Sequence, residues 1–140
     1  MDLTISYANV WVDDHESAID FYTRKLGFEL REDVTVPEMG NFRWVAVGPP
    51  GGEGVSLVLM PIPGPPVFEP ETQAQVRAIV AKGAAGGIFL STPDCRATIE
   101  ELRGRGVEIV QEPTEVPYGV DAGVRDPFGN HIRVVQPPAA

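Results

Sequence analysis

Arg133, Asp121 and His131 have side chains suited to binding a ligand or moving a proton. An arginine can hold a carboxylate or a phosphate through two parallel hydrogen bonds. Arg133 can equally pair with Asp121 as a structural ion pair, and the sequence leaves both alternatives open. His131 can act as a general base, because its side chain titrates near neutral pH. Its position beside a turn favours an exposed place at a sheet rim instead.

Aromatic side chains and one amide are candidates for contact with a planar ligand. Tyr7, Asn9 and Trp11 alternate along one stretch, so they share a face if it forms a strand. Their rings and that of Phe89 can stack on a flat molecule, although core packing is the commoner use of aromatic residues. Asn9 needs a hydrogen-bond partner if it is buried, and a ligand can supply one.

Two further reactive residues have no evident catalytic partner in the sequence. His15 follows Asp14 in the first turn of a predicted helix, and we expect it to be solvated. Cys95 also begins a predicted helix, where the thiol pKa can be lowered. Because no histidine is matched to it, we expect an inert thiol.

These residues lie on two successive sets of predicted elements. In the first half, a strand is followed by a helix that Asp13 and Asp14 can cap and that ends at Gly27, and then by three strands. The second half repeats this order, and Thr92 or Asp94 can cap its helix. The predicted ranges are 5–12, 15–26, 28–36, 42–48 and 55–60, and then 87–92, 95–105, 107–111, 118–125 and 131–136. The fold class is therefore α+β, with two tandem βαβββ units.

The turn at 126–130 predicts a closing hairpin that pairs Arg125 with His131. Asp121 then shares a face with Arg133, one diagonal away, within reach of a long side chain. Between the two units, residues 61–86 are rich in proline, with a short helix predicted over 71–82. That segment is either a linker or a flap over a site.

The length, charge and cysteine content of the chain limit the partners and locations that we expect for it. The chain has 140 residues, with 11 basic against 20 acidic side chains, a net charge of −9. One domain is expected at this length. The acidity disfavours nucleic acid as a partner. With a single cysteine, no apolar run of about 20 residues and no N-terminal signal pattern, we expect a cytoplasmic protein without membrane contact.

The paired units, the segment DHESAIDFYTRKLGFEL at 14–30 and the DPFGN at 126–130 resemble the vicinal oxygen chelate superfamily. That superfamily contains glyoxalase I, extradiol dioxygenases, and fosfomycin- and bleomycin-resistance proteins. The resemblance implies a single domain over 1–140, with units at about 3–60 and 87–137 and the connection at 61–86. It also implies that the units form a barrel-like cleft.

The resemblance further implies four positions for the ligands of a divalent metal. They fall on Tyr7, near Leu57, on Gly87 and on Arg133. Leucine and glycine side chains donate nothing, a tyrosine must first lose its proton, and arginine is a fixed cation. We therefore expect no metal and no cofactor.

The cleft implied by the resemblance gathers mostly apolar and aromatic side chains, as is usual for small-molecule sites. Strand parity assigns Leu57 and Leu59 to its face. We predict ligand contacts from six further residues on that face: Tyr7, Asn9, Trp11, Phe89, Asp121 and Arg133.

Three functions remain open at this point. The first is a metal-independent homodimeric binder that sequesters a small molecule, as the bleomycin-resistance branch does. The second is a lyase, isomerase or dioxygenase-type enzyme acting on a small oxygenated metabolite. It would need a metal site elsewhere, or acid–base work by Asp121, Tyr7 or His131. The third is an association protein that uses residues 61–86 as a contact surface.

Overall fold

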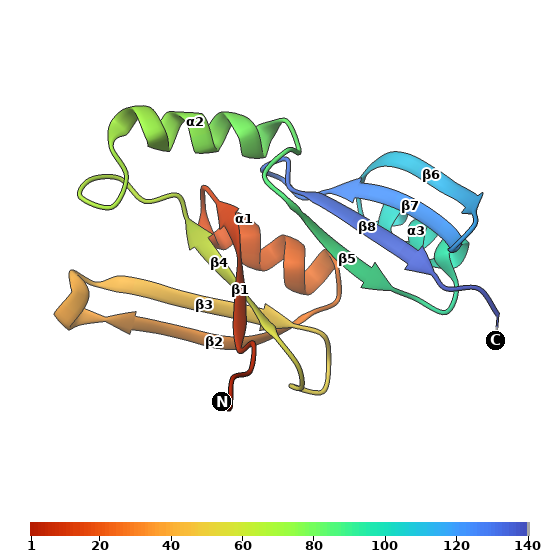
Figure 1. Ribbon diagram of the computed structural model, residues 1–140, viewed down its shortest axis with the longest axis horizontal. Coiled ribbons are helices and arrows are strands. Elements are labelled where there is room, and N and C mark those ends of the chain that lie inside the picture. The colour runs from red at the N-terminus through yellow and green to blue at the C-terminus, as the bar shows by residue number, and fades with distance from the viewer. Residues whose placement is uncertain (140) are drawn as a thin grey trace. The chain divides into compact units, whose positions relative to one another are not determined.

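Two four-stranded sheets, one in each half of the chain, dominate the computed structural model, which describes residues 1–139 (Figure 1). The chain divides into two compact units, with the boundary between Pro63 and Gly64. The predicted α+β class with tandem βαβββ units is confirmed. Each sheet is open, and the strands described here do not close into a barrel. A cleft shared by the two units stays a prediction.

The first unit has the sheet order β1-β4-β3-β2, with β1 parallel to β4 and the other pairs antiparallel. Its helix begins where Asp14 accepts a hydrogen bond from the Ser17 backbone N–H at 2.8 Å. The second half of this helix widens into π-helical turns. The elements are β1 (Tyr7–Val12), α1 (His15–Ile19), η1 (Asp20–Lys25), β2 (Glu29–Val36), η2 (Pro37–Met39), β3 (Phe42–Gly48) and β4 (Ser56–Pro61).

The second unit repeats this arrangement with the order β5-β8-β7-β6 and with β5 parallel to β8. Asp94 is the helix cap, accepting from the Ala97 backbone N–H at 3.0 Å. An additional helix precedes the repeat, close to the range predicted for it. The elements are α2 (Pro70–Ala81), β5 (Gly87–Ser91), α3 (Cys95–Gly104), β6 (Glu108–Val116), β7 (Gly119–Arg125) and β8 (His131–Gln136).

One face of each sheet is buried under its own helix. In the first unit Val10, Val45 and Leu59 are buried with Phe21 and Tyr22 of the helix. In the second unit the buried side chains of α3 and of the sheet are Cys95, Ile99, Leu102, Ala122, Val124, Ile132 and Val134. Such burial contributes about 1.5–3 kcal/mol for each large apolar side chain. The opposite faces carry the candidate site residues. None of the helices in the described part of the chain has the length and hydropathy needed to span a bilayer.

The assignment of Leu57 and Leu59 to the cleft face is wrong. The parallel register places Leu57 beside Ala8 and Leu59 beside Val10, on the helix-covered face. Neighbours in register point to the same side of a sheet, so Ser56, not Leu57, shares the face of Tyr7. Sequence parity within β4 alone did not reveal the offset between β4 and β1.

Strand β6 runs five residues beyond the predicted end at Gln111 and includes Pro113. A proline is tolerated there because β6 is an edge strand, and its register with β7 shifts between Gln111 and Thr114. Pro113 therefore does not end β6 but lies where the register shifts, within a longer strand.

Candidate ligand-binding site

A hollow of about 730 Å³ lies on the sheet of the second unit. Its volume is within the range typical of small-molecule sites, about 300–1,000 Å³. Side chains from all four strands, and from the turn between β6 and β7, line it. They are Phe89, Gln111, Val116, Tyr118, Asp121, His131, Arg133 and Val135.

Arg133 is held in this hollow by hydrogen bonds from most of its guanidinium. Nε donates to Asp121 Oδ1 at 3.2 Å, and Nη2 donates to Asp121 Oδ2 at 2.6 Å and to Gln111 Oε1 at 2.9 Å. Nη1 donates to His131 Nε2 at 3.2 Å. Four of the five N–H groups of the guanidinium are thus engaged within the protein. Of the two roles left open for Arg133, the geometry supports the ion pair with Asp121.

Asp121 is buried. Burial alone would raise the pKa of its carboxyl, but hydrogen bonds from Arg133 and Tyr118 outweigh burial and lower that pKa. The Tyr118 hydroxyl donates to Asp121 Oδ2 at 2.9 Å, and this bond to a carboxylate raises the pKa of the tyrosine. The hydroxyl oxygen of Tyr118 can still accept a hydrogen bond from a ligand.

Gly123 makes room for the contact between Arg133 and His131. A Cβ at this position would lie 2.9 Å from Arg133 Nη1 and 3.2 Å from His131 Cε1. The register pairs Gly123 with Arg133 and Arg125 with His131, as the closing hairpin predicted. The absence of a side chain at Gly123 therefore lets both polar groups lie over the sheet.

The remaining wall of the hollow is apolar. Phe89 on β5 is 77% exposed, unusually open for a phenylalanine, and Val116 and Val135 line the hollow with it. An exposed aromatic ring beside a polar cluster suits an organic ligand with one flat face and a few polar atoms.

The site residues predicted on β1 lie in the first unit. Tyr7, Asn9 and Trp11 share one face, as strand parity predicted, and Asn9 is exposed, not buried. The Tyr7 hydroxyl donates to Glu32 Oε1 at 2.6 Å, which raises the tyrosine pKa, and its ring meets Trp44 edge-on at 5.2 Å. Trp44 Nε1 donates to the other oxygen of Glu32.

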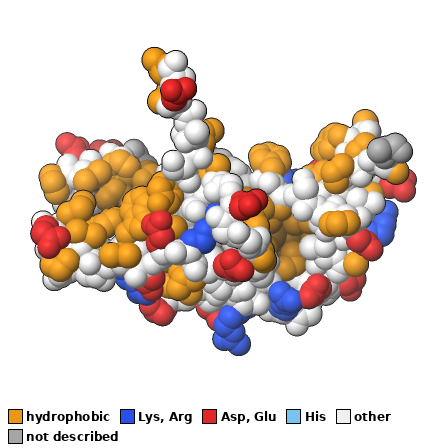
Figure 2. All heavy atoms as spheres, turned by 90° about the horizontal axis from the view of Figure 1, so that it is seen from below, with side chains coloured by type: hydrophobic (Ala, Val, Ile, Leu, Met, Phe, Trp, Pro, Cys, Tyr) orange, Lys and Arg blue, Asp and Glu red, His pale blue; other side chains and the backbone are white. Residues whose placement is uncertain are grey.

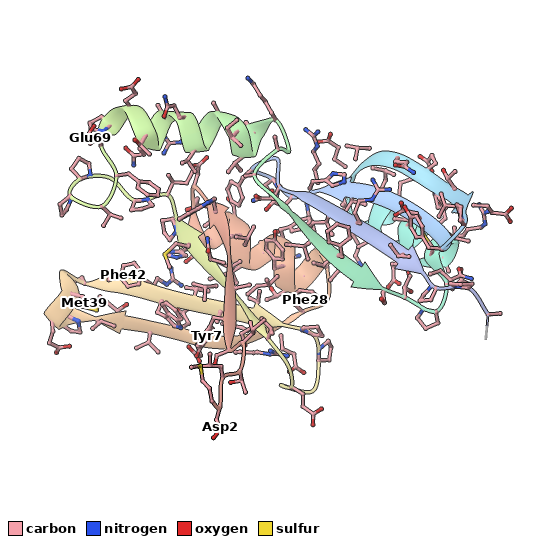
Figure 3. All side chains as sticks on the ribbon, viewed as in Figure 1. Asp2, Tyr7, Phe28, Met39, Phe42 and Glu69 are labelled. Atoms are coloured by element: carbon pink, nitrogen blue, oxygen red, sulfur yellow. The ribbon has the colours of Figure 1, made fainter. Side chains whose placement is uncertain are left out.

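Apolar side chains are also exposed on β2 and around the turn that joins it to β3, among them Val34 and Met39. Figure 2 shows hydrophobic side chains gathered over several areas of one face of the molecule, between scattered acidic groups. Met39 and Phe42 stand at the tip of the β2–β3 hairpin (Figure 3).

The structure thus brings together Phe89, Asp121 and Arg133 in one hollow, and Tyr7, Asn9 and Trp11 on one sheet face. Contact of any of the six with a ligand stays a prediction. Sequence reasoning did not select Tyr118, Gln111 and Val116. The sequence could have identified Gln111, because pairing the predicted strand 107–111 with β7 places Gln111 opposite Gly123.

The structure bears on three expectations about reactive side chains. His131 is half-buried in the hollow and not an exposed rim residue. His15 is half-buried as well, with Nε2 3.1 Å from the Leu59 carbonyl oxygen, so the prediction of a solvated side chain is wrong. Burial raises the pKa of the Cys95 thiol, as an inert cysteine requires.

The positions at which the resemblance implies metal ligands do not form a donor set. Tyr7 donates its proton to Glu32, Gly87 has no side chain, and Arg133 is a cation bound to Asp121. On β4 the matching face carries Ser56 and Val58. Within residues 1–139 no group of three or more His, Cys, Asp and Glu side chains is arranged to hold a metal ion. The residues present do not fit a divalent cation at these positions.

Comparison with known proteins agrees with this architecture. Residues 4–134 match the family model described as the Glyoxalase/Bleomycin resistance protein/Dioxygenase superfamily. YurT, an uncharacterized protein of Bacillus subtilis, is 33% identical over 96% of this chain and 99% of its own. The crystal structure of UcmS2 is 43% identical, with a TM-score of 0.87 over 96% of this chain and 98% of that one. TnmS3, described as an antibiotic binding protein from Streptomyces sp. CB03234, is 32% identical, with a TM-score of 0.75 over 98% of both chains.

Proposed function

This chain belongs to the Glyoxalase/Bleomycin resistance protein/Dioxygenase superfamily, and from that premise we propose that it binds and sequesters an uncharged organic small molecule without a metal ion. The observation that carries the proposal is the hollow of the second unit, where Arg133 occupies an implied metal-ligand position and is neutralised by Asp121. A guanidinium at that position has no lone pair to offer a metal ion, while the apolar wall suits an organic ligand.

The ligand class follows from the chemistry of the walls. Phe89 offers an exposed ring for stacking, and Val116 and Val135 add apolar area. The one arginine and one aspartate of the hollow balance each other, so neither a strong anion nor a strong cation is favoured. An antibiotic with a planar aromatic portion fits this description, and TnmS3 is described as binding an antibiotic.

The proposal also covers the assembly of the protein, its further ligand contacts and its location. We propose a single domain that pairs as a homodimer, because a two-fold pair is the commonest assembly of soluble proteins. Ligand contacts from Tyr7, Asn9 and Trp11 are proposed as well, since their face is exposed at Tyr7 and Asn9. A cytoplasmic location is consistent with a single, buried and unpaired cysteine.

A thermal-shift screen of antibiotics on protein treated with a chelator tests the proposal, followed by calorimetric titration of each compound that raises the melting temperature. Stacking on Phe89 predicts that Phe89→Ala weakens binding by about 1.5–3 kcal/mol, roughly 10- to 150-fold. The exposure of this ring predicts little change in stability.

Val67→Ala is the matched control, because Val67 is an exposed apolar residue of the same unit outside the hollow. Its affinity should equal that of the unsubstituted protein. Binding that appears only after a divalent metal is added, or an affinity insensitive to Phe89→Ala, would contradict the proposal.

A further inference from the structure

We propose that Arg133 fixes His131 as the neutral tautomer protonated on Nδ1, which makes His131 the hydrogen-bond donor that selects ligands bearing a carbonyl or similar oxygen. The tautomer follows from the protein alone. The selection of a ligand rests on the proposed function.

The tautomer is set by the chemistry of the guanidinium. Arg133 Nη1 lies 3.2 Å from His131 Nε2, and a guanidinium nitrogen can only donate. Nε2 must therefore accept through its lone pair. In a neutral imidazole the other nitrogen then carries the proton, so Nδ1 bears the N–H group.

Arg133 cannot easily turn away from His131, because its other nitrogens are held in place. Asp121 accepts from Nε and from Nη2, and Gln111 accepts from Nη2 as well. The Arg133 and Asp121 side chains are mostly buried, and the planar guanidinium is fixed by contacts on two of its three nitrogens. The orientation of Nη1 toward His131 is thus dictated by β6 and β7.

The charges around His131 also keep it neutral. Burial lowers the pKa of His131, and the nearby cations Arg133 and Arg125 lower it further, while Asp121 acts in the opposite direction. Protonation of Nε2 would remove its lone pair and place a second positive charge beside the guanidinium. At neutral pH the imidazole is therefore uncharged.

This state determines what His131 can do. With Nε2 accepting from Arg133 and Nδ1 protonated, no lone pair is free to take a proton from a substrate, so His131 does not act as a general base. Its Nδ1–H has no hydrogen-bond acceptor among residues 1–139, and the side chain lines the hollow. A ligand oxygen in the hollow is the acceptor that we assign to it.

Nitrogen-15 NMR of the imidazoles in the full chain without ligand tests the tautomer. The chain has two histidines, and His15 serves as the internal control. His15 Nε2 faces the Leu59 carbonyl, which can only accept, so His15 must carry its proton on Nε2. We expect opposite tautomers for the two residues. A His131 protonated on Nε2, or on both nitrogens at pH 7, would overturn the proposal.

The double substitution Arg133→Met with Asp121→Asn tests the cause. It removes the Arg133 guanidinium that donates to His131. It also removes the Asp121 charge, which Arg133→Met alone would leave buried without a partner. We expect His131 to shift toward the Nε2–H tautomer and its pKa to rise. An unchanged tautomer in the folded variant would show that Arg133 does not fix it, and if the variant fails to fold, the unsubstituted protein still decides.

Two planar probes that differ in one carbonyl, 9-fluorenone and fluorene, test the donor role. One added neutral hydrogen bond predicts about two- to tenfold tighter binding of fluorenone, with a shift of the His131 Nδ1–H signal. Equal affinities would overturn the donor role. If neither probe bound, the aromatic hollow of the proposed function would be contradicted and the selection of a ligand by His131 with it, while the tautomer, which is measured without ligand, would be unaffected.

Discussion

Asp121 and Arg133 form a mostly buried ion pair, with 7% and 16% of their side-chain areas exposed. Taking two charges out of water is costly, and the pair is retained here with three further hydrogen-bond partners, Tyr118, Gln111 and His131. Removing one partner strands the other charge. The pair therefore matters more to stability than the exposed ion pairs of the chain.

We predict that Asp121→Ala lowers the free energy of unfolding by about 3–5 kcal/mol, because it leaves the Arg133 guanidinium buried without its counter-ion. Chemical denaturation measures this value. Asp20→Ala is the matched control, since Asp20 pairs with Arg24 on the surface and should change stability by about 0.5 kcal/mol or less. Equal effects of the two substitutions would show that the buried pair has no special role.

The same carboxylate predicts a dependence of stability on pH. The pKa of Asp121 is lower in the folded protein than in the unfolded chain. Its contribution is therefore fully present above the unfolded-state pKa, near 4, and is lost as the pH falls through the folded-state pKa. The stability difference between the unsubstituted protein and Asp121→Asn should shrink as the pH is lowered from 6 to 3. A constant difference would contradict the assignment.

The sequence predicted that Asp121 and Arg133 lie close together, but it did not decide the role of Arg133. The hairpin at 126–130 placed Asp121 one diagonal from Arg133, and the structure has that contact. The choice between ligand anchor and ion pair needed the positions of Gln111 and His131, which depend on three strands at once. Spacing along one strand does not carry that information.

At the scale of elements, Arg31 secures the turn between β3 and β4. It lies at a bulge in β2, and its guanidinium donates to the carbonyls of Pro49 at 2.9 Å and Glu53 at 2.7 Å and to the Ser56 hydroxyl at 3.0 Å. Hydrogen bonds from a charged donor are among the stronger ones. One side chain thus satisfies several backbone acceptors of a glycine-rich loop.

We predict that Arg31→Ala lowers the free energy of unfolding by about 1.5–3 kcal/mol, the net contribution of a hydrogen bond from a charged donor, because several carbonyls lose that donor. Hydrogen exchange should increase selectively in residues 49–56. Arg24→Ala is the control, since Arg24 is largely exposed in a local helical ion pair and should have little effect. If both arginines proved equally dispensable, the turn would not depend on Arg31.

Strong local sequence signals predicted the helix caps and several strand limits correctly. Asp14 and Asp94 cap their helices, and β3 and β8 have the predicted limits. The errors arose where tertiary pairing overrides local pattern. Pro113 is accommodated by an edge bulge, and the face of Leu57 is fixed by register with β1.

At the scale of the whole molecule, the duplicated βαβββ unit explains how one chain can have two sheet faces that carry different side chains. The first unit presents Tyr7 and Trp44 around Glu32, whereas the second presents Arg133 around Asp121 in a hollow. Both faces hold a carboxylate that is satisfied by neighbouring donors. The two units therefore share a fold, while the implied metal positions carry Tyr7, Gly87 and Arg133, which do not fit a divalent cation.

Native mass spectrometry of chelator-treated protein, mixed with an antibiotic that raises its melting temperature, tests the central claim most directly. It reports bound compound, bound metal and any chemical change in the same spectrum. We predict the mass of the intact antibiotic added to the protein, with no metal ion. A complex that forms only once a divalent ion is restored, or a bound species of altered mass, would contradict metal-independent sequestration.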